Sequence, residues 1–220
     1  MTKPTETETR SGKRPIVIGL ASVLVILGAV YVIWGANGNS VNAQTCDQSM
    51  KIAETIKPLA KGDVAAFLPA QSPLPLNTLE FKDPEGQPVK MSQFEDKTIL
   101  LNLWATWCAP CRHEMPALNE LHTIMSSDTF EVVTVNLDRG GIEKPKAFFE
   151  EVGADALTLY NDPSNTMLGE LRKKGRGTGL PTTILIGPDG CEVGTMYGPA
   201  EWASSEAMAL IKAALSKLTG

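Results

Sequence analysis

A buried strand that ends in a pair of cysteines constrains this chain more than any other feature of its sequence. Residues 98–105 are mostly apolar, as in a strand covered on both faces, and Cys108 and Cys111 follow directly. Apolar residues then recur at helical spacing from Met115 to Met125, so the cysteines lie where a strand gives way to a helix. Pro110 fits the first turn of that helix, where a missing N–H leaves no hydrogen bond unmade.

This arrangement is typical of a redox centre. The N-terminus of a helix stabilises the thiolate of Cys108, and Cys111 lies about one turn further on, within reach of a disulfide. A zinc site would need two further ligands at suitable spacing, but Cys46 and Cys191 lie far away. Haem attachment would need a histidine where Arg112 stands. We therefore expect redox chemistry without a metal or other cofactor; a metal site and an inert disulfide are the alternatives.

The N-terminal part predicts a membrane anchor. Residues 15–34 carry no charge and, at helical rise, match the hydrocarbon thickness of a bilayer. Four basic residues precede this segment and only Lys51 is basic in the twenty residues after it, which places residues 1–14 in the cytoplasm. A spacer at 35–45 would then lead to an exported domain at 46–220. A signal peptide cleaved at 41–43 is the alternative, and it implies export as well.

Export bears on the two remaining cysteines. Exported proteins rarely keep idle thiols, so once Cys108 pairs with Cys111 we expect a structural disulfide between Cys46 and Cys191. Closing so long a loop contributes about 4–5 kcal/mol in the chain-entropy model. Two independent buried thiols are the alternative.

Strands and helices alternate along the exported part. This order implies a sheet with parallel strands and right-handed crossovers. Prolines at 69, 73 and 75 predict a loop before the first strand. Periodicity and turn residues predict helices over 47–62, 111–125, 143–152, 164–171 and 208–218, and strands over 79–81, 89–91, 98–105, 130–137, 157–160, 181–186 and 191–197.

Two separated motifs together resemble the thioredoxin superfamily. Trp107-Cys108-Ala109-Pro110-Cys111 is followed about 70 residues later by Gly179-Leu180-Pro181-Thr182, and the resemblance covers about residues 76–218. It implies a thioredoxin-like α/β fold: a central mixed sheet flanked by helices, with an extra β/α insertion and an N-terminal helical extension. It also implies a cis peptide bond before Pro181, beside the disulfide, with the backbone of Leu180 presented to an incoming peptide.

The pattern Cys-X-Pro-Cys-X-X-Glu-X-Pro at 108–116, together with the anchor, is similar to the TlpA, ResA and CcmG group. These are anchored, outward-facing thiol–disulfide oxidoreductases of cytochrome biogenesis. Residues 102–118 most resemble TlpA, which is associated with cytochrome c oxidase assembly and keeps copper-ligand cysteines reduced. The resemblance implies a single-pass protein of a bacterial inner membrane with its domain in the periplasm. It also implies an electron donor of the DsbD or CcdA kind.

Two positions near the cysteines depart from ordinary thioredoxin. Asn102 stands where thioredoxins carry a buried Asp, and an amide cannot accept a proton near neutral pH. Glu114 takes the position that a Glu occupies in ResA-like proteins, and we expect it to assist proton transfer at Cys111; a glutamate on the helix surface is the alternative. Of the two histidines, we expect His113 to be solvated and His122 to be partly buried.

The expected mechanism is thiol–disulfide exchange. Cys108 attacks a client disulfide, Cys111 resolves the mixed disulfide, and Trp107 forms a hydrophobic lip or an anchor for the turn. The uncharged Ala109-Pro110 pair favours a reducing potential, nearer that of thioredoxin (about −270 mV) than that of DsbA (about −120 mV).

The expected function is that of a reductase for cysteine pairs of oxidase copper-site proteins. A reductase for apocytochrome c, of the CcmG kind, is the first alternative. A disulfide-forming oxidant and a non-enzymatic copper chaperone are the others. No histidine follows the helix at 111–125 to serve as the chaperone's distant ligand. The net charge of −5, without a basic stripe, argues against nucleic acid as a partner.

Overall fold

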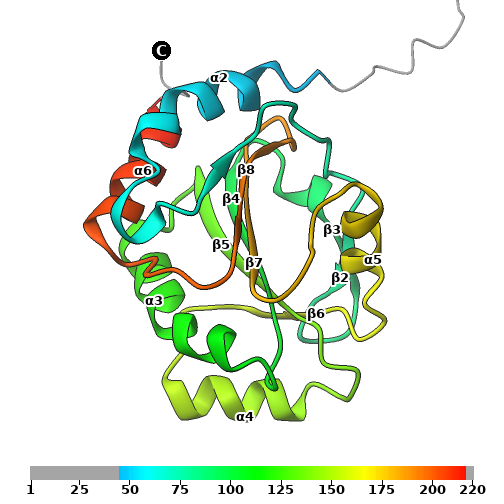
Figure 1. Ribbon diagram of the computed structural model, residues 1–220. Coiled ribbons are helices and arrows are strands. Elements are labelled where there is room, and N and C mark those ends of the chain that lie inside the picture. Colours follow the sequence, from blue (N-terminus) through cyan, green and yellow to red (C-terminus); the bar gives the residue numbers. More distant parts are fainter. Residues whose placement is uncertain (1–44, 217–220) are drawn as a thin grey trace, which may run out of the picture. The chain divides into compact units, whose positions relative to one another are not determined.

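The computed structural model describes residues 45–216, and within them eight strands form one mixed sheet in the order β1-β8-β7-β4-β5-β6-β2-β3 (Figure 1). The strands are β1 (Leu68–Pro69), β2 (Glu80–Lys82), β3 (Pro88–Lys90), β4 (Thr98–Trp104), β5 (Phe130–Asn136), β6 (Leu159–Asn161), β7 (Thr182–Ile186) and β8 (Glu192–Tyr197). The helices are α2 (Asp47–Ile56), α3 (Ala109–Met125), α4 (Glu143–Val152), α5 (Thr166–Lys173) and α6 (Ser205–Ser216), with short 3-10 turns at Lys57–Leu59, Gly62–Val64 and Met91–Phe94.

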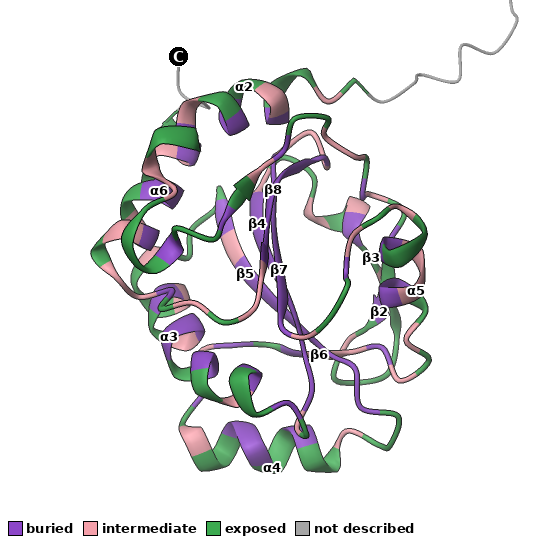
Figure 2. Ribbon diagram, in the orientation of Figure 1, coloured by how far each residue is buried: buried purple, intermediate pink, exposed green. Residues whose placement is uncertain are grey.

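Strand β4 lies at the centre of the sheet and is buried along its whole length (Figure 2). It pairs in parallel with β5, with Leu101 opposite Val133, and antiparallel with β7, with Leu101 opposite Ile184. A strand covered on both faces needs apolar side chains at nearly every position, which explains why residues 98–105 are mostly apolar.

The two faces of β4 contribute to different hydrophobic clusters. Leu100 and Trp104 pack with residues of α2, α3, α4 and α6, whereas Leu101 and Leu103 pack with residues of α5 and β2. Because side chains alternate along a strand, Asn102 belongs to the face of Leu100 and Trp104, toward α3.

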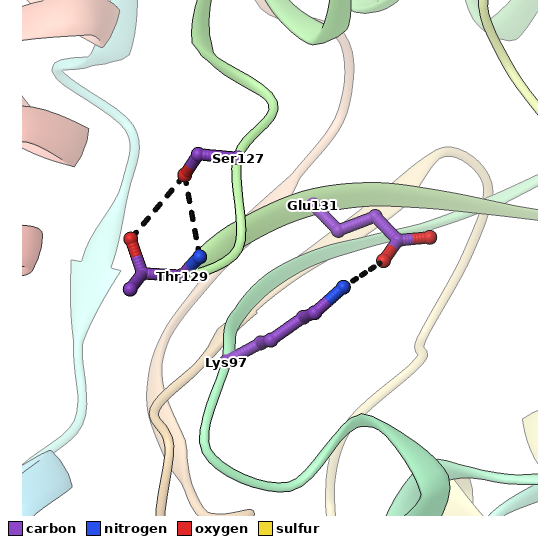
Figure 3. A network of polar contacts seen from close by, with 4 residues as sticks. All are labelled: Lys97, Ser127, Thr129 and Glu131. Atoms are coloured by element: carbon purple, nitrogen blue, oxygen red, sulfur yellow. Dashed lines mark hydrogen bonds and ion pairs between the residues drawn. The ribbon is translucent and has the colours of Figure 1, made fainter.

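The ends of β4 and β5 opposite the cysteine pair are fixed by polar contacts (Figure 3). Lys97 Nζ lies 3.2 Å from Glu131 Oε2. In the turn before β5, Ser127 Oγ accepts a hydrogen bond from Thr129 N (3.3 Å). The backbone N–H of Thr98 donates to Thr129 O at 2.9 Å, so this turn also starts the pairing of β4 with β5.

The N-terminal helix α2 is attached to the β7–β8 hairpin. Cys46 forms a disulfide with Cys191, and Ser49 N donates to Asp189 Oδ2 at 2.9 Å. The hydroxyl of Ser49 donates to Asp189 Oδ1 and to Cys191 O. The extension therefore packs as part of the domain.

The thioredoxin-like fold class is confirmed, and the elements differ from the predicted ones mainly at their ends. The helix predicted over 47–62 stops at Ile56 and continues as a 3-10 turn that contains Pro58. The helix predicted to start at residue 164 starts at Thr166, after Asn165 in a left-handed conformation (φ 58°). Asp162 Oδ2 accepts from Met167 N at 2.8 Å and so caps this helix.

The prediction that the proline-rich stretch is only a loop was wrong. Leu68 and Pro69 form an edge strand opposite Thr195 and Gly194 of β8. A proline is tolerated there because an edge strand has one side free of pairing. The approach is so close that a Cβ on Gly194 would lie 2.5 Å from the ring of Phe67.

The predicted tail, anchor and nearly all of the spacer fall on residues 1–44, which lie outside the described residues. Within 45–216, no helix is both long enough and apolar enough to span a bilayer.

Candidate active site

Cys108 and Cys111 form a disulfide at the junction of β4 and α3, with an S–S distance of 2.08 Å and Cα atoms 5.3 Å apart. Cys108 is the N-cap residue of α3, and its Sγ accepts a hydrogen bond from Cys111 N at 3.3 Å. The sulfur thus takes the place that a Ser or Asp oxygen has in an ordinary N-cap. In the dithiol form this N–H and the helix dipole favour the thiolate of Cys108. Cys108 is 5% exposed and Cys111 is fully buried, so of the two residues Cys108 is the one with surface open to solvent.

The loop before β7 meets the cysteine turn at the same end of the sheet. β7 runs antiparallel to β4 with Thr182 opposite Leu103, so the start of β7 lies beside the end of β4. The Leu180–Pro181 peptide bond is cis. Leu180 packs against the hydrophobic cluster that contains both cysteines. The two motifs that are about 70 residues apart in sequence are therefore neighbours in space.

Trp107 is 72% exposed, the highest value among the large hydrophobic side chains of the described residues. A ring this exposed contributes little packing to the turn itself. Its position directly before Cys108 leaves it available to an incoming protein, and that role stays a prediction.

Glu114 is buried, with 3% of its surface exposed, so the alternative of a surface glutamate is wrong. It lies one turn after Cys111 on the same side of α3. Its Oε1 accepts from Asn102 Nδ2 at 2.7 Å, and its Oε2 accepts from Ala200 N at 3.2 Å and from Trp202 Nε1 at 3.3 Å.

Burial raises the pKa of Glu114 to about 7, and the hydrogen bonds from Asn102, Ala200 and Trp202 oppose part of that rise. Loss of hydration penalises the charged carboxylate more than three neutral donors can compensate. A carboxyl group with this pKa gains or loses a proton readily near neutral pH, which fits proton transfer; the transfer itself stays a prediction.

Asn102 connects three elements beneath the cysteines. Besides its bond to Glu114, its Nδ2 donates to Thr183 Oγ1 of β7 at 2.9 Å. Within the described residues Asn102 Oδ1 is buried without a hydrogen-bond partner. The sequence identified Asn102 only as a departure from thioredoxin and missed it as the partner of Glu114. Face alternation along β4 could have placed Asn102 toward α3.

Trp202 and Ala200 were also missed, because they lie in the segment before α6, which carries no motif. Their donors reach Glu114 only through the tertiary packing of that segment on α3. Nothing in the sequence pattern connects residues so far apart.

A second polar cluster holds the cysteine turn to the end of β5. Asp138 Oδ2 accepts from Thr106 N at 3.1 Å and from Asn136 Nδ2 at 3.0 Å. Asn136 Oδ1 in turn accepts from Asp138 N at 3.0 Å. Thr106 lies two residues before Cys108, so this cluster fixes where the turn leaves the sheet.

Helix α4 supports the start of α3. The guanidinium of Arg112 lies 4.3 Å from the ring centroid of Phe148 and pairs with Glu151 (3.2 Å). Trp104 stacks on Phe149 with centroids 5.4 Å apart. These contacts attach both the end of β4 and the start of α3 to the insertion that follows β5.

The Cys46–Cys191 disulfide lies at the opposite end of the sheet. Cys191 is fully buried at the β7–β8 turn, and the Sγ atoms are 2.03 Å apart. Because β7 starts beside the Cys108 turn and runs away from it, this bond is separate from the redox pair. All four cysteines of the chain are accounted for by the two disulfides.

The described residues contain no cluster of three His, Cys, Asp or Glu side chains suited to hold a metal ion. His113 is exposed and His122 is half-buried, both on α3, as the sequence predicted.

Comparison with known proteins agrees with this geometry. The profile of the AhpC/TSA family matches residues 72–191. The chain is 34% identical over 109 residues to the thiol-disulfide oxidoreductase ResA of Geobacillus thermodenitrificans, covering 49% of this chain and 59% of that protein. It is 30% identical over 117 residues to ResA of Bacillus subtilis strain 168, covering 53% and 62%. The match spans about three fifths of the length of these curated relatives.

Among solved structures, a putative thiol:disulfide interchange protein DsbE from Chlorobium tepidum superposes with a TM-score of 0.53 and 28% identity, over 65% of this chain and 94% of that one. A thioredoxin family protein from Chlorobium tepidum TLS superposes with a TM-score of 0.55 at 22% identity, over 66% of this chain and 99% of that one. This likeness shows the fold alone. The matches thus include ResA, one of the relatives that the motif at 108–116 predicted.

Proposed function

Since the chain belongs to the AhpC/TSA family, we propose that it is a thiol–disulfide oxidoreductase that acts on cysteine pairs of other proteins. The observation that carries the proposal is the Cys108–Cys111 disulfide at the N-terminus of α3, with Cys108 as the N-cap and Cys111 buried behind it. One sulfur is reachable and favoured as a thiolate, and the second is close enough to displace whatever binds to the first.

The reaction starts from the dithiol form. The Cys108 thiolate attacks one sulfur of a client disulfide; that S–S bond breaks, the first client thiolate leaves, and a mixed disulfide forms. Cys111 then loses its proton and attacks the Sγ of Cys108, and the second client thiolate leaves. Two electrons pass to the client, its two thiolates take up protons, and the disulfide seen in the structure is formed. A dithiol donor must then reduce the protein again.

We propose that Glu114 accepts the proton of the Cys111 thiol and returns it in the reverse direction. Its carboxylate lies one helical turn from Cys111, away from solvent, and its pKa of about 7 matches the pH at which exchange would run. It acts as a base when Cys111 attacks and as an acid in the reverse direction.

We propose that the reductive direction prevails. Between the cysteines stand Ala109 and Pro110, neither of which offers a charge or an imidazole to stabilise the Cys108 thiolate further. Since a strongly stabilised thiolate is what makes a disulfide oxidising, its absence favours a low potential. Equilibration with glutathione tests this: a value above about −180 mV would contradict a reductase.

We further propose that residues 15–34 anchor the protein in a bacterial inner membrane with residues 46–220 in the periplasm. The uncharged segment of 15–34 and the basic residues before it support this orientation. Fractionation of cells with an antibody to the domain tests it, because a shortened soluble form would contradict a retained anchor.

The proposed clients are the copper-site proteins of cytochrome oxidase, with an electron donor of the DsbD or CcdA kind. The likeness of residues 102–118 to TlpA supports this choice. Apocytochrome c, the client in the CcmG role, is the second candidate. Deletion of the gene separates the two: loss of oxidase activity with normal cytochrome c haem supports the first, and loss of cytochrome c haem supports the second.

A trapping experiment tests the activity itself. The reduced full chain should reduce a disulfide-containing protein, and Cys108→Ser should abolish the reaction. Cys111→Ser should accumulate a mixed disulfide through Cys108, which non-reducing electrophoresis resolves. If Cys108→Ser kept the activity, or if Cys111→Ser trapped no partner, the proposed function would be wrong.

A further inference from the structure

An open groove of about 980 Å³ begins at the cysteine turn and extends across the insertion between β5 and α5. Trp107 and Leu180 line it at the end nearest Cys108. Arg139, Lys144 and Arg172 line it further out, from the β5–α4 loop, the first turn of α4 and the last turn of α5. The groove therefore joins an apolar end beside the reactive sulfur to a basic part beyond it.

The positive charge of the basic part is not neutralised by ion pairs. Arg139, Lys144 and Arg172 are all exposed, and within residues 45–216 none of them forms an ion pair. Among the described residues, the guanidinium of Arg172 donates only to the carbonyl of Gly177, at 3.1 Å. By contrast, the nearby Lys173 is paired with Glu170.

The groove is also lined by two acidic residues, so its three cations leave an excess of one positive charge. Glu143 is exposed at its rim, but Asp138 is buried and its Oδ2 is used by Thr106 and Asn136. A local excess of cations is notable in a chain whose net charge is −5. Unpaired surface charge of one sign attracts and orients a partner of the opposite sign.

We propose that this groove receives the segment that flanks a client's cysteine pair and selects for acidic side chains in that segment. The inference rests on the proposed oxidoreductase activity. Trp107 and Leu180 contact the residues next to the attacked cysteine. Arg139, Lys144 and Arg172 contact carboxylates further along the same segment.

The test uses three disulfide peptides that differ only in the residues flanking the cysteines: three Asp, three Ser or three Lys. The reduced full chain is mixed with each peptide, and second-order rate constants are measured at low and at high salt. We expect the Asp peptide to react about 10-fold faster than the Lys peptide at low ionic strength. The ratio should fall to about twofold near 0.5 M salt, where charges are screened within a few ångströms.

The variant Arg139→Glu/Lys144→Glu should remove or invert the preference for the Asp peptide. The matched control is Lys51→Glu/Lys57→Glu, which makes the same change in net charge on exposed residues of α2 and the turn after it. In Figure 1, α2 lies at the top and α4 at the bottom of the molecule, so the control is remote from the groove. The control should keep the Asp/Lys ratio of the unaltered chain.

The outcomes are distinguishable. Equal rates with all three peptides would overturn the groove proposal and leave the oxidoreductase function intact. The groove proposal would also be overturned if the α2 control changed the Asp/Lys rate ratio as much as the groove variant does. The effect would then come from net charge. If none of the peptides is reduced, the proposed function itself fails.

Discussion

Asn102 Nδ2 lies 2.7 Å from Glu114 Oε1, in the buried layer between β4 and α3 beneath the redox cysteines. An amide at this position donates to the carboxylate when Glu114 is charged. Its Oδ1, which has no hydrogen-bond partner among residues 45–216, can accept from the carboxyl O–H when Glu114 is protonated, after rotation of the amide. Asn102 can therefore form a hydrogen bond with Glu114 in either protonation state. A charged aspartate in the same place could not donate a hydrogen bond to the Glu114 carboxylate.

Glu114→Gln should slow the step in which Cys111 displaces the client, by about 10-fold or more above neutral pH, because the amide cannot accept a proton. In the unaltered chain the rate of this step should rise with pH through about 7, the pKa of Glu114, and the variant should lose that rise. Stopped-flow decay of a preformed mixed disulfide at several pH values measures it. A pH profile shared by both proteins would argue against a role for Glu114.

The same carboxyl should make the protein more stable in mild acid. The pKa of Glu114 is raised from 4.5 to about 7 on folding, so between these values the folded state binds the proton more tightly than the unfolded state. Its contribution to the free energy of unfolding is therefore fully present below about pH 4.5 and is lost as the pH rises through 7. The shift in pKa corresponds to a contribution of about 3 kcal/mol to the free energy of unfolding.

Denaturant unfolding of the oxidised protein at pH 5 and pH 8 checks this expectation. Glu114→Gln should lessen the difference in unfolding free energy between pH 5 and pH 8 by about 2.5 kcal/mol, a little less than the full contribution because pH 5 lies above the unfolded pKa of 4.5. Glu120→Gln is the matched control, since Glu120 is exposed on the same helix. If both variants show the pH dependence of the unaltered chain, another group is responsible.

Asn102→Ala should destabilise the protein by about 1–3 kcal/mol, because it leaves Glu114 Oε1 buried without its donor. The loss should be greater at pH 8 than at pH 5, since the charged carboxylate needs the donor more than the neutral acid does. A double-mutant cycle with Glu114→Gln measures the coupling. Additive effects at both pH values would mean that the two side chains act independently.

The redox pair could be read from the sequence because its signals are local. A strand, a Cys-X-X-Cys spacing and a helix are neighbours in the chain, and their geometry follows from one turn of backbone. The nearly continuous apolar run of β4 likewise predicted that both of its faces are buried.

The surroundings of Glu114 could not be read in this way. Its partners come from β4, from the segment before α6 and, through Asn102, from β7. Such contacts depend on tertiary packing, which no periodic pattern records. The edge strand β1 was missed for a related reason. A proline predicts a loop locally, but Leu68 and Pro69 pair with the outer side of β8, and that pairing depends on tertiary structure.

Removing the second disulfide should cost stability without affecting the redox site. Cys46→Ser/Cys191→Ser should lower the free energy of unfolding by about 2–5 kcal/mol, because the bond closes a long loop and holds α2 to the β7–β8 hairpin. The alkylation rate of Cys108 in the reduced protein should stay the same, since the two cysteine pairs lie at opposite ends of the sheet. Mass spectrometry of Cys108→Ser/Cys111→Ser under non-reducing conditions provides the control: two free thiols there would show that Cys46 and Cys191 are not bonded. A large change in Cys108 reactivity would instead show that the hairpin transmits strain along β7 to the active site.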